Sequence, residues 1–228
     1  MPTVLITGAS RGIGLELARC YAAGGASVIG CCRNPSSAQK LAELPGDVTV
    51  MTLDVADARS VAALAEALGD RPVDTLINNA GISGPSYDRQ NVYSMDFDGW
   101  ADAFAVNTMG PVRMLQALMP NLKASGDARV VNITSQMGAL ALDMTVAYAY
   151  CTSKAALNKF MKMAAIELKR DGIHVCLIHP GWVQTDMGGA NAEITPQASA
   201  EGIVRVVDGL NATTTGSFWK WNGETHAW

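Results

Sequence analysis

The fold is decided by residues 3–14, which read TVLITGASRGIG. A short run of apolar and β-branched residues precedes three glycines, and a stretch with apolar residues at helical spacing follows them. This order predicts a buried strand, a tight turn and a helix. Gly8 permits the turn, Gly12 lets the backbone approach a pyrophosphate, and Gly14 permits close packing of the helix on the strand.

The same turn predicts a bound nucleotide. Free N–H groups and the positive end of the helix dipole gather at a helix N-terminus, and both favour phosphate. The spacing is G-x-x-x-G-x-G rather than G-x-G-x-x-G, and three close glycines also occur in ordinary turns. Nucleotide contacts are predicted at Gly8, Ser10, Arg11, Gly12, Ile13 and Gly14.

Strand and helix patterns then alternate along the chain. Strands are predicted over 3–7, 27–32, 48–53, 73–78, 129–134, 173–178 and, as an aromatic one, 216–221. Helices are predicted over 12–23, 36–44, 57–68, 97–122, 147–170 and 196–210. Most of the strands are apolar on both faces, as in a sheet covered by helices on both sides. The pattern predicts an α/β fold, with residues 1–228 forming a single doubly wound Rossmann-type domain around a mostly parallel seven-stranded sheet.

The composition excludes several classes of function. The formal net charge of −4 gives no electrostatic footprint for nucleic acid or for an anionic membrane. The five cysteines are odd in number and lack C-x-x-C spacing, so reduced thiols are expected. The three histidines lack metal-ligand spacing, and no metal site is predicted. The first apolar run is too short for a signal peptide or a membrane span, so the cytoplasm is the expected location.

The end of the second predicted strand indicates which nucleotide binds. An NAD site needs a carboxylate there for the ribose 2′-OH, but no acidic residue occurs between Glu16 and Glu43. Arg33 stands where a guanidinium can hold a 2′-phosphate, and Arg11 adds a second positive charge. The alternative is that both arginines are solvated surface residues. The missing carboxylate favours NADP(H) over NAD(H).

A tyrosine and a lysine four residues apart suggest acid–base chemistry. Tyr150 and Lys154 share one face of the predicted helix over 147–170. An ammonium beside a phenol favours phenolate, so Lys154 is predicted to lower the pKa of Tyr150. Tyr148 competes for the role, but position 152 is a threonine. The pair is not specific by itself, because any helix can carry it.

Several motifs occur together in a fixed order. They are Thr7-Gly8-x-x-x-Gly12-x-Gly14, Asn78-Asn79-Ala80-Gly81, Asn107, Ser135, Tyr150-x-x-x-Lys154 and Pro180-Gly181-x-Val183-x-Thr185. In this the chain resembles the short-chain dehydrogenase/reductase family over essentially its whole length. Arg33-Asn34-Pro35 and the aromatic-rich residues 216–228 resemble the subgroup that contains the C-factor signalling protein and Sniffer-type carbonyl reductases. Tyr150 follows Ser135 by fifteen residues, somewhat more than is common in that family.

The resemblance implies a role for each matching residue. Tyr150 would protonate the carbonyl oxygen, and Ser135 would hydrogen-bond it. Lys154 would hold the nicotinamide ribose, and Asn107 would hold a water of a proton relay behind that lysine. Cofactor contacts are implied at Asp54, Val55, Asn79, Ala80, Gly81, Tyr150, Lys154, Pro180, Gly181, Val183 and Thr185. Simpler alternatives exist for single residues, since Asn107 can kink its helix and Ser135 can cap a strand end.

The function expected from these features is an NADPH-dependent oxidoreductase that reduces an aldehyde or ketone, or runs the reverse reaction on an alcohol. The alternative is an NADP-binding signalling or regulatory protein of the C-factor type with incidental catalysis. Segments 82–95 and 181–194 are expected to wall the substrate site. Six residues could give it an apolar lining, with ordinary packing as the alternative for each: Tyr87, Tyr93, Met137, Leu140, Trp182 and Met187. Contacts through the helices over 97–122 and 147–170 would give a homodimer or homotetramer.

Overall fold

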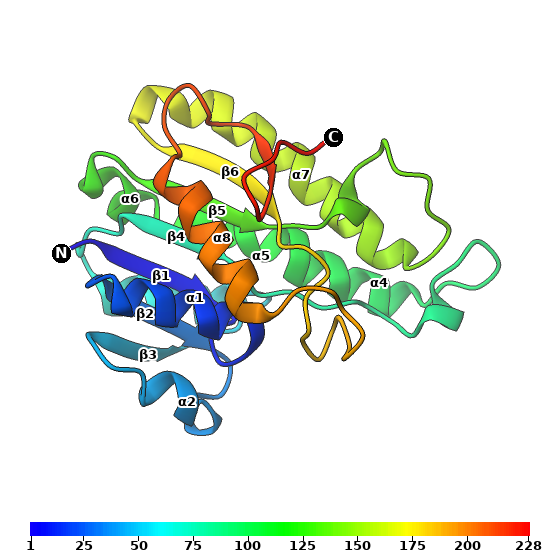
Figure 1. Ribbon diagram of the computed structural model, residues 1–228, viewed down its shortest axis with the longest axis horizontal. Coiled ribbons are helices and arrows are strands. Elements are labelled where there is room, and N and C mark those ends of the chain that lie inside the picture. Colours follow the sequence, from blue (N-terminus) through cyan, green and yellow to red (C-terminus); the bar gives the residue numbers. More distant parts are fainter.

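A computed structural model describes residues 1–228 and has one seven-stranded sheet at its centre (Figure 1). The strands are β1 (Thr3–Thr7), β2 (Ser27–Cys32), β3 (Val48–Thr52), β4 (Thr75–Asn78), β5 (Arg129–Ile133), β6 (His174–His179) and β7 (Phe218–Lys220). Their order is β3-β2-β1-β4-β5-β6-β7, and every neighbouring pair is parallel. The predicted fold class is confirmed, with a sheet that is wholly rather than mostly parallel.

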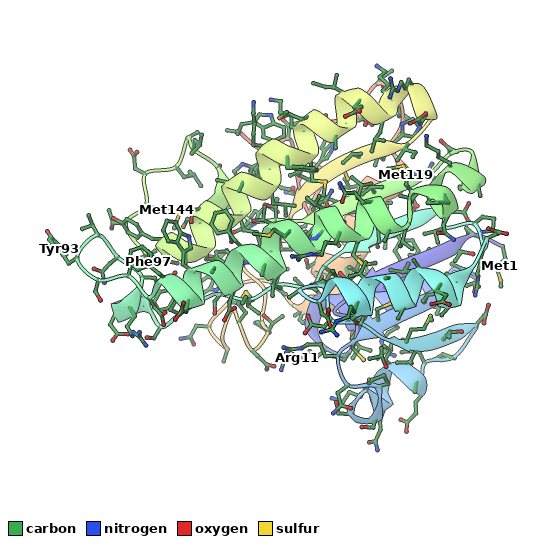
Figure 2. The ribbon with its side chains drawn as sticks, turned by 180° about the vertical axis from the view of Figure 1, so that it is seen from behind. Met1, Arg11, Tyr93, Phe97, Met119 and Met144 are labelled. Atoms are coloured by element: carbon green, nitrogen blue, oxygen red, sulfur yellow. The ribbon has the colours of Figure 1, made fainter.

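Helices cover both faces of the sheet. They are α1 (Gly12–Ala23), α2 (Gln39–Ala42), α3 (Ala58–Leu68), α4 (Phe97–Phe104), α5 (Gly110–Ala117), α6 (Met119–Ser125), α7 (Tyr148–Leu168) and α8 (Pro196–Asp208). One core cluster lies under α1, α2 and α8, on the side that Figure 1 shows. The other lies under α3, α5, α6 and α7, on the side that Figure 2 shows. This arrangement explains why β1, β2, β4 and β6 are buried along their whole length.

The edge strand β3 departs from the predicted pattern. None of its five residues is fully buried, whereas its sequence suggested a strand covered on both faces. The helix predicted over 36–44 also shrinks to a 3-10 turn at Pro35–Ser37 and the four-residue helix α2. Both lie at the open edge of the sheet, where fewer neighbours are present to cover them.

The prediction of one long helix over 97–122 is wrong, because this stretch forms three shorter helices. A π-helical turn at Ala105–Met109 separates α4 from α5, and Pro120 stands in the first turn of α6. A π turn arises where the regular hydrogen-bond ladder is interrupted, and proline lacks the N–H that would continue the ladder. The π turn contains Asn107, so the break coincides with a predicted site residue.

Because all strands are parallel, the segments that follow them meet at one edge of the sheet. These segments include the glycine turn after β1, Asn79-Ala80-Gly81 after β4, Ser135 after β5 and Pro180-Gly181 after β6. None of the helices combines the length and hydropathy that a bilayer span requires. The structure brings no three His, Cys, Asp or Glu side chains together in a way that would hold a metal ion.

Candidate active site

A groove of about 510 Å³ runs along the carboxyl edge of the sheet. It begins at the glycine turn and ends at α7, so it joins the predicted nucleotide site to the predicted acid–base pair. Of the predicted site residues, it is lined by Gly8, Ser10, Arg11, Gly12, Ile13, Arg33, Asp54, Val55, Asn79, Ala80, Gly81, Tyr150, Lys154, Pro180 and Thr185. Gly14, Asn107, Ser135, Gly181 and Val183 are not part of its lining.

The glycine turn has the backbone that only glycine adopts readily. Gly8 and Gly12 have φ angles of +66° and +55°. A Cβ on Gly8 would lie 2.9 Å from the Cα of Ala80, so the two segments approach at backbone distance. Gly14 is buried behind the groove, where a Cβ would collide with the carbonyl oxygen of Gly8. Gly14 therefore serves packing, as its position in the motif suggested.

The helix N-terminus behind this turn is free to bind an anion. Arg11 is the N-cap of α1, and its side chain makes no capping hydrogen bond. The first turn of α1 also carries no acidic residue. The backbone N–H groups at this end therefore face the groove without an intramolecular carboxylate to satisfy them.

The cations around the groove differ from the prediction in two respects. Arg33 is exposed and lines the groove, and Lys40 of α2 lines it as well. Sequence reasoning missed Lys40, although its place on the helix after the second strand was a usable signal. Arg11 instead pairs with Asp186, with 2.7 Å between Nη1 and Oδ2. Figure 2 shows Arg11 at the end of the sheet opposite Met1.

Tyr150 lies in the first turn of α7 and lines the far end of the groove. Burial raises the pKa of its phenol to about 12, and the hydrogen bond with the Ser135 side chain acts in the opposite direction. Ser135 also caps the short turn that follows β5, since its Oγ accepts from the N–H of Met137 at 3.1 Å. The capping role and the contact with Tyr150 therefore coexist in one side chain.

Lys154 is one helical turn after Tyr150 and is almost fully buried, with 4% of its surface exposed. Its Nζ donates to the carbonyl oxygen of Ile133 at 2.8 Å and lies 5.8 Å from the centroid of the Tyr150 ring. Burial lowers the pKa of this ammonium to about 8. The prediction that Lys154 lowers the pKa of Tyr150 is wrong for this structure, because burial dominates and the ammonium is held by β5.

Asn107 is fully buried and connects three segments. Its Oδ1 accepts from the N–H of Ile82 at 2.9 Å, and its Nδ2 donates to the Ile82 carbonyl at 2.8 Å and to Ser153 Oγ at 3.0 Å. A Cβ placed on Gly81 would lie 3.2 Å from Asn107 Oδ1 and 3.6 Å from Lys154 Nζ. The π turn thus places Asn107 Oδ1 next to Gly81, which Lys154 Nζ also approaches.

Some predicted substrate contacts are not brought to the groove. Met187 lines it, and Tyr87 is close enough to Tyr150 to raise that phenol's pKa. Tyr93 and Leu140 are 96% and 89% exposed, and Figure 2 shows Tyr93 at the tip of a projecting loop. The expectation that these two line a pocket is wrong, because loops after the strands extend beyond the sheet edge.

Two further residues of the motif after β6 lie apart from the groove. The side chain of Val183 is buried, and the residue forms an isolated bridge with Ile194. Gly181 borders a second cavity of about 320 Å³ together with Gln136, His179 and Trp182. A direct contact of Val183 with a cofactor stays a prediction.

Comparison with known proteins agrees with this geometry. The sequence model described as short chain dehydrogenase matches residues 2–195, which include the glycine turn, Ser135 and the Tyr150–Lys154 pair. The chain belongs to the short-chain dehydrogenase family. Among curated relatives, this short-chain dehydrogenase is 42% identical to the C-signal of Myxococcus xanthus over 158 residues, which are 69% of this chain and 93% of the relative.

Solved structures give the same result for the fold. This short-chain dehydrogenase superimposes on the carbonyl reductase Sniffer of D. melanogaster with a TM-score of 0.92 at 29% identity, covering 100% of both chains. The NADPH-bound carbonyl reductase from chicken fatty liver gives a TM-score of 0.90 at 31% identity, covering 100% of this chain and 99% of the other. The predicted resemblance to the family, and to its C-factor and Sniffer subgroup, is confirmed.

Proposed function

We propose that this protein is an NADPH-dependent reductase of small aldehydes or ketones, with Tyr150 as general acid. The observation that carries the proposal is the placement of Tyr150 and Lys154 at one end of a groove whose other end is the glycine turn, with Ser135 next to Tyr150 behind the lining. The high structural similarity to an NADPH-bound carbonyl reductase supports it. In the reverse direction the same residues would oxidise an alcohol.

The residues of the groove fit NADP(H) better than NAD(H). The uncapped N-terminus of α1 suits a pyrophosphate. Arg33 and Lys40 supply positive charge for a 2′-phosphate, and no carboxylate follows β2. Bound NADPH supplies the hydride that reduces the carbonyl carbon.

The protein's own part is to hold and protonate the carbonyl oxygen. A phenol with a pKa near 12 is protonated at neutral pH, so Tyr150 is ready to donate in the reductive direction. Ser135 already faces the Tyr150 hydroxyl, and both can hydrogen-bond the same oxygen. The buried ammonium of Lys154 adds positive charge next to the site where negative charge develops. Asn107 fixes Ile82 and Ser153 around it.

The assembly is proposed to be a homodimer or homotetramer. Phe160, Met163 and Ile166 are large apolar residues of α7, and they are 42%, 58% and 77% exposed. A helix face of this kind suits a second copy of the chain. Light scattering of the purified protein would distinguish a monomer from these states.

A second candidate is an NADP-binding signalling protein with incidental catalysis. The identity of 42% to C-signal favours it. The presence of Asn107, Ser135, Tyr150 and Lys154 together favours the enzyme, because a protein that only binds has no need of the acid–base group.

The deciding experiment is a panel of aldehydes and ketones assayed by NADPH absorbance, with Tyr150→Phe as the control. Turnover that disappears in the Tyr150→Phe variant would support the reductase. Tight NADPH binding without turnover on any compound would favour the signalling protein instead.

A further inference from the structure

The segment after β7 is tied to the part of the chain between the two proposed catalytic residues. Residues 221–228 turn back along β7, with the N–H of His226 bonded to the carbonyl of Phe218 at 2.7 Å. They then continue to residues 139–147, which connect the turn after Ser135 to α7. The carbonyl of Trp228 accepts from the N–H of Ala141 at 3.1 Å.

This contact matters because residues 139–147 have little other support. All side chains from Leu140 to Val146 are exposed. The bond between Ala141 and Trp228 is the one hydrogen bond that joins the backbone of this segment to a part of the chain outside residues 135–151. Ala147, which ends the segment, is the only non-glycine residue with a positive φ angle (+52°), a conformation that surrounding contacts have to maintain.

Trp228 is itself held firmly. Its ring lies 5.6 Å from that of buried Phe218, and Lys162 Nζ stands 4.0 Å from its centroid. That distance is within the range of a cation–π interaction. Lys162 belongs to α7, the helix that carries Tyr150 and Lys154. Trp228 therefore bridges the catalytic helix and the segment that leads into it.

A series of aromatic contacts connects Trp228 through Phe218 and His226 to β6. Phe218 stacks on His226 at 4.6 Å, and His226 meets His179 edge-on at 5.8 Å. His179 is the last residue of β6 and precedes Pro180, which lines the groove. None of residues 221–228 lines the groove itself.

We propose that Trp228 is a positioning residue for the carbonyl substrate. By anchoring residues 139–147, it keeps Ser135 and Tyr150 at the mutual position that receives the carbonyl oxygen. The inference rests on the proposed reductase function for its kinetic consequence but not for the anchoring itself. It also relates to the somewhat long spacing between Ser135 and Tyr150, since a longer connection needs an external support.

The test compares Trp228→Ala with Trp228→Phe. The alanine variant removes the ring from Lys162 and Phe218, and we expect kcat/KM for the carbonyl substrate to fall by roughly tenfold or more, because small misplacements at a reacting centre are costly. The affinity for NADPH, measured by fluorescence titration, should stay within about twofold, since the groove is untouched. The phenylalanine variant keeps a ring and should recover most of the loss, and Lys162→Gln should give an intermediate loss.

Two further measurements separate positioning from a general loss of stability. Leu68→Ala, at the end of α3, is the control for destabilisation, and it should leave kcat/KM per folded molecule unchanged. Amide hydrogen exchange should become faster in residues 139–147 of Trp228→Ala and not across α7. Unchanged exchange at Ala141, or an unchanged kcat/KM in Trp228→Ala, would overturn the proposal. If the wild-type protein reduces no carbonyl compound, the proposed function fails, and the exchange experiment still decides whether Trp228 anchors the segment.

Discussion

The two ends of the groove are built in different ways. At the glycine turn every residue of β1 is buried, and backbone approaches backbone so closely that side chains are excluded. At the substrate end, residues 140–146 and the tip of segment 82–95 expose apolar side chains beyond the groove, and residues 140–146 make few backbone hydrogen bonds. A ligand common to many proteins needs one rigid backbone shape, whereas a variable substrate is met by loops. The cofactor end of the groove can therefore be predicted from a local sequence motif, whereas the loops around the substrate end cannot.

The largest effect should come from Tyr150, the proposed acid at the substrate end of the groove. Tyr150→Phe is expected to lower turnover by about a hundred- to ten-thousandfold, because a positioned acid contributes that much. NADPH affinity should change little, since the glycine end is intact. Tyr148→Phe is the matched control and should keep most of its turnover. Steady-state kinetics and a cofactor titration on both variants check this. If Tyr148→Phe is inactive and Tyr150→Phe is active, the acid has been assigned to the wrong tyrosine.

A pair of glycine substitutions measures the rigidity of each end. Gly8→Ala should destabilise the protein by several kcal/mol and weaken NADPH binding strongly, since its Cβ meets the backbone of Ala80 at a φ of +66°. Gly189 also has a positive φ, but no atom lies within 4 Å of its Cβ position. Gly189→Ala should therefore cost only about 1 kcal/mol and leave cofactor binding unchanged. Urea unfolding and NADPH titration would test both variants. Equal losses of stability and of NADPH affinity in the two variants would contradict the predicted difference between the two ends.

The stability of the protein should depend on pH through His179. Burial, helped by the nearby His226 and Lys220, lowers the pKa of His179 from 6.5 to about 4. Between these values the unfolded chain binds a proton that the folded protein does not, so stability is retained above about pH 6.5 and lost as the pH falls toward 4. The expected contribution is about 3 kcal/mol of unfolding free energy. The free energy of unfolding of His179→Gln should vary less with pH over this range. A pH profile parallel to that of the wild type would show that His179 is not the group responsible.

The smallest expected effect concerns cofactor choice at the glycine end. Arg33→Asp should reduce the preference for NADPH over NADH by roughly tenfold or more, about 1.4 kcal/mol. Lys40→Ala should reduce it less, since Arg33 remains. Arg11→Ala should have the least effect if Arg11 stays paired with Asp186. The ratio of kcat/KM for the two cofactors measures all three, and a wild type that uses both equally would contradict the prediction.

The sequence by itself determined the fold class, the order of the elements and the choice of candidate site residues. Helix α1 has the predicted bounds, and so do β1 and β2. These features depend on short-range spacing, such as two residues one helical turn apart or a glycine where the φ angle is positive. The same local logic located Tyr150 and Lys154 on one helix, and Gly8 and Gly12 in one turn.

Only the tertiary structure determined the pKa values of the site residues, the partners of their charged groups and the contacts that hold them in place. The ammonium of Lys154 is held by Ile133, twenty-one residues away, and Arg11 is paired with Asp186, which is 175 residues away. Burial sets the pKa of Tyr150 in the direction opposite to that predicted from its neighbour on the helix. A π turn interrupts the helix that the sequence pattern would continue, and Asn107 in this turn bonds to Ile82. Desolvation and contacts between distant segments exist only once the sheet has assembled, so no local pattern records them.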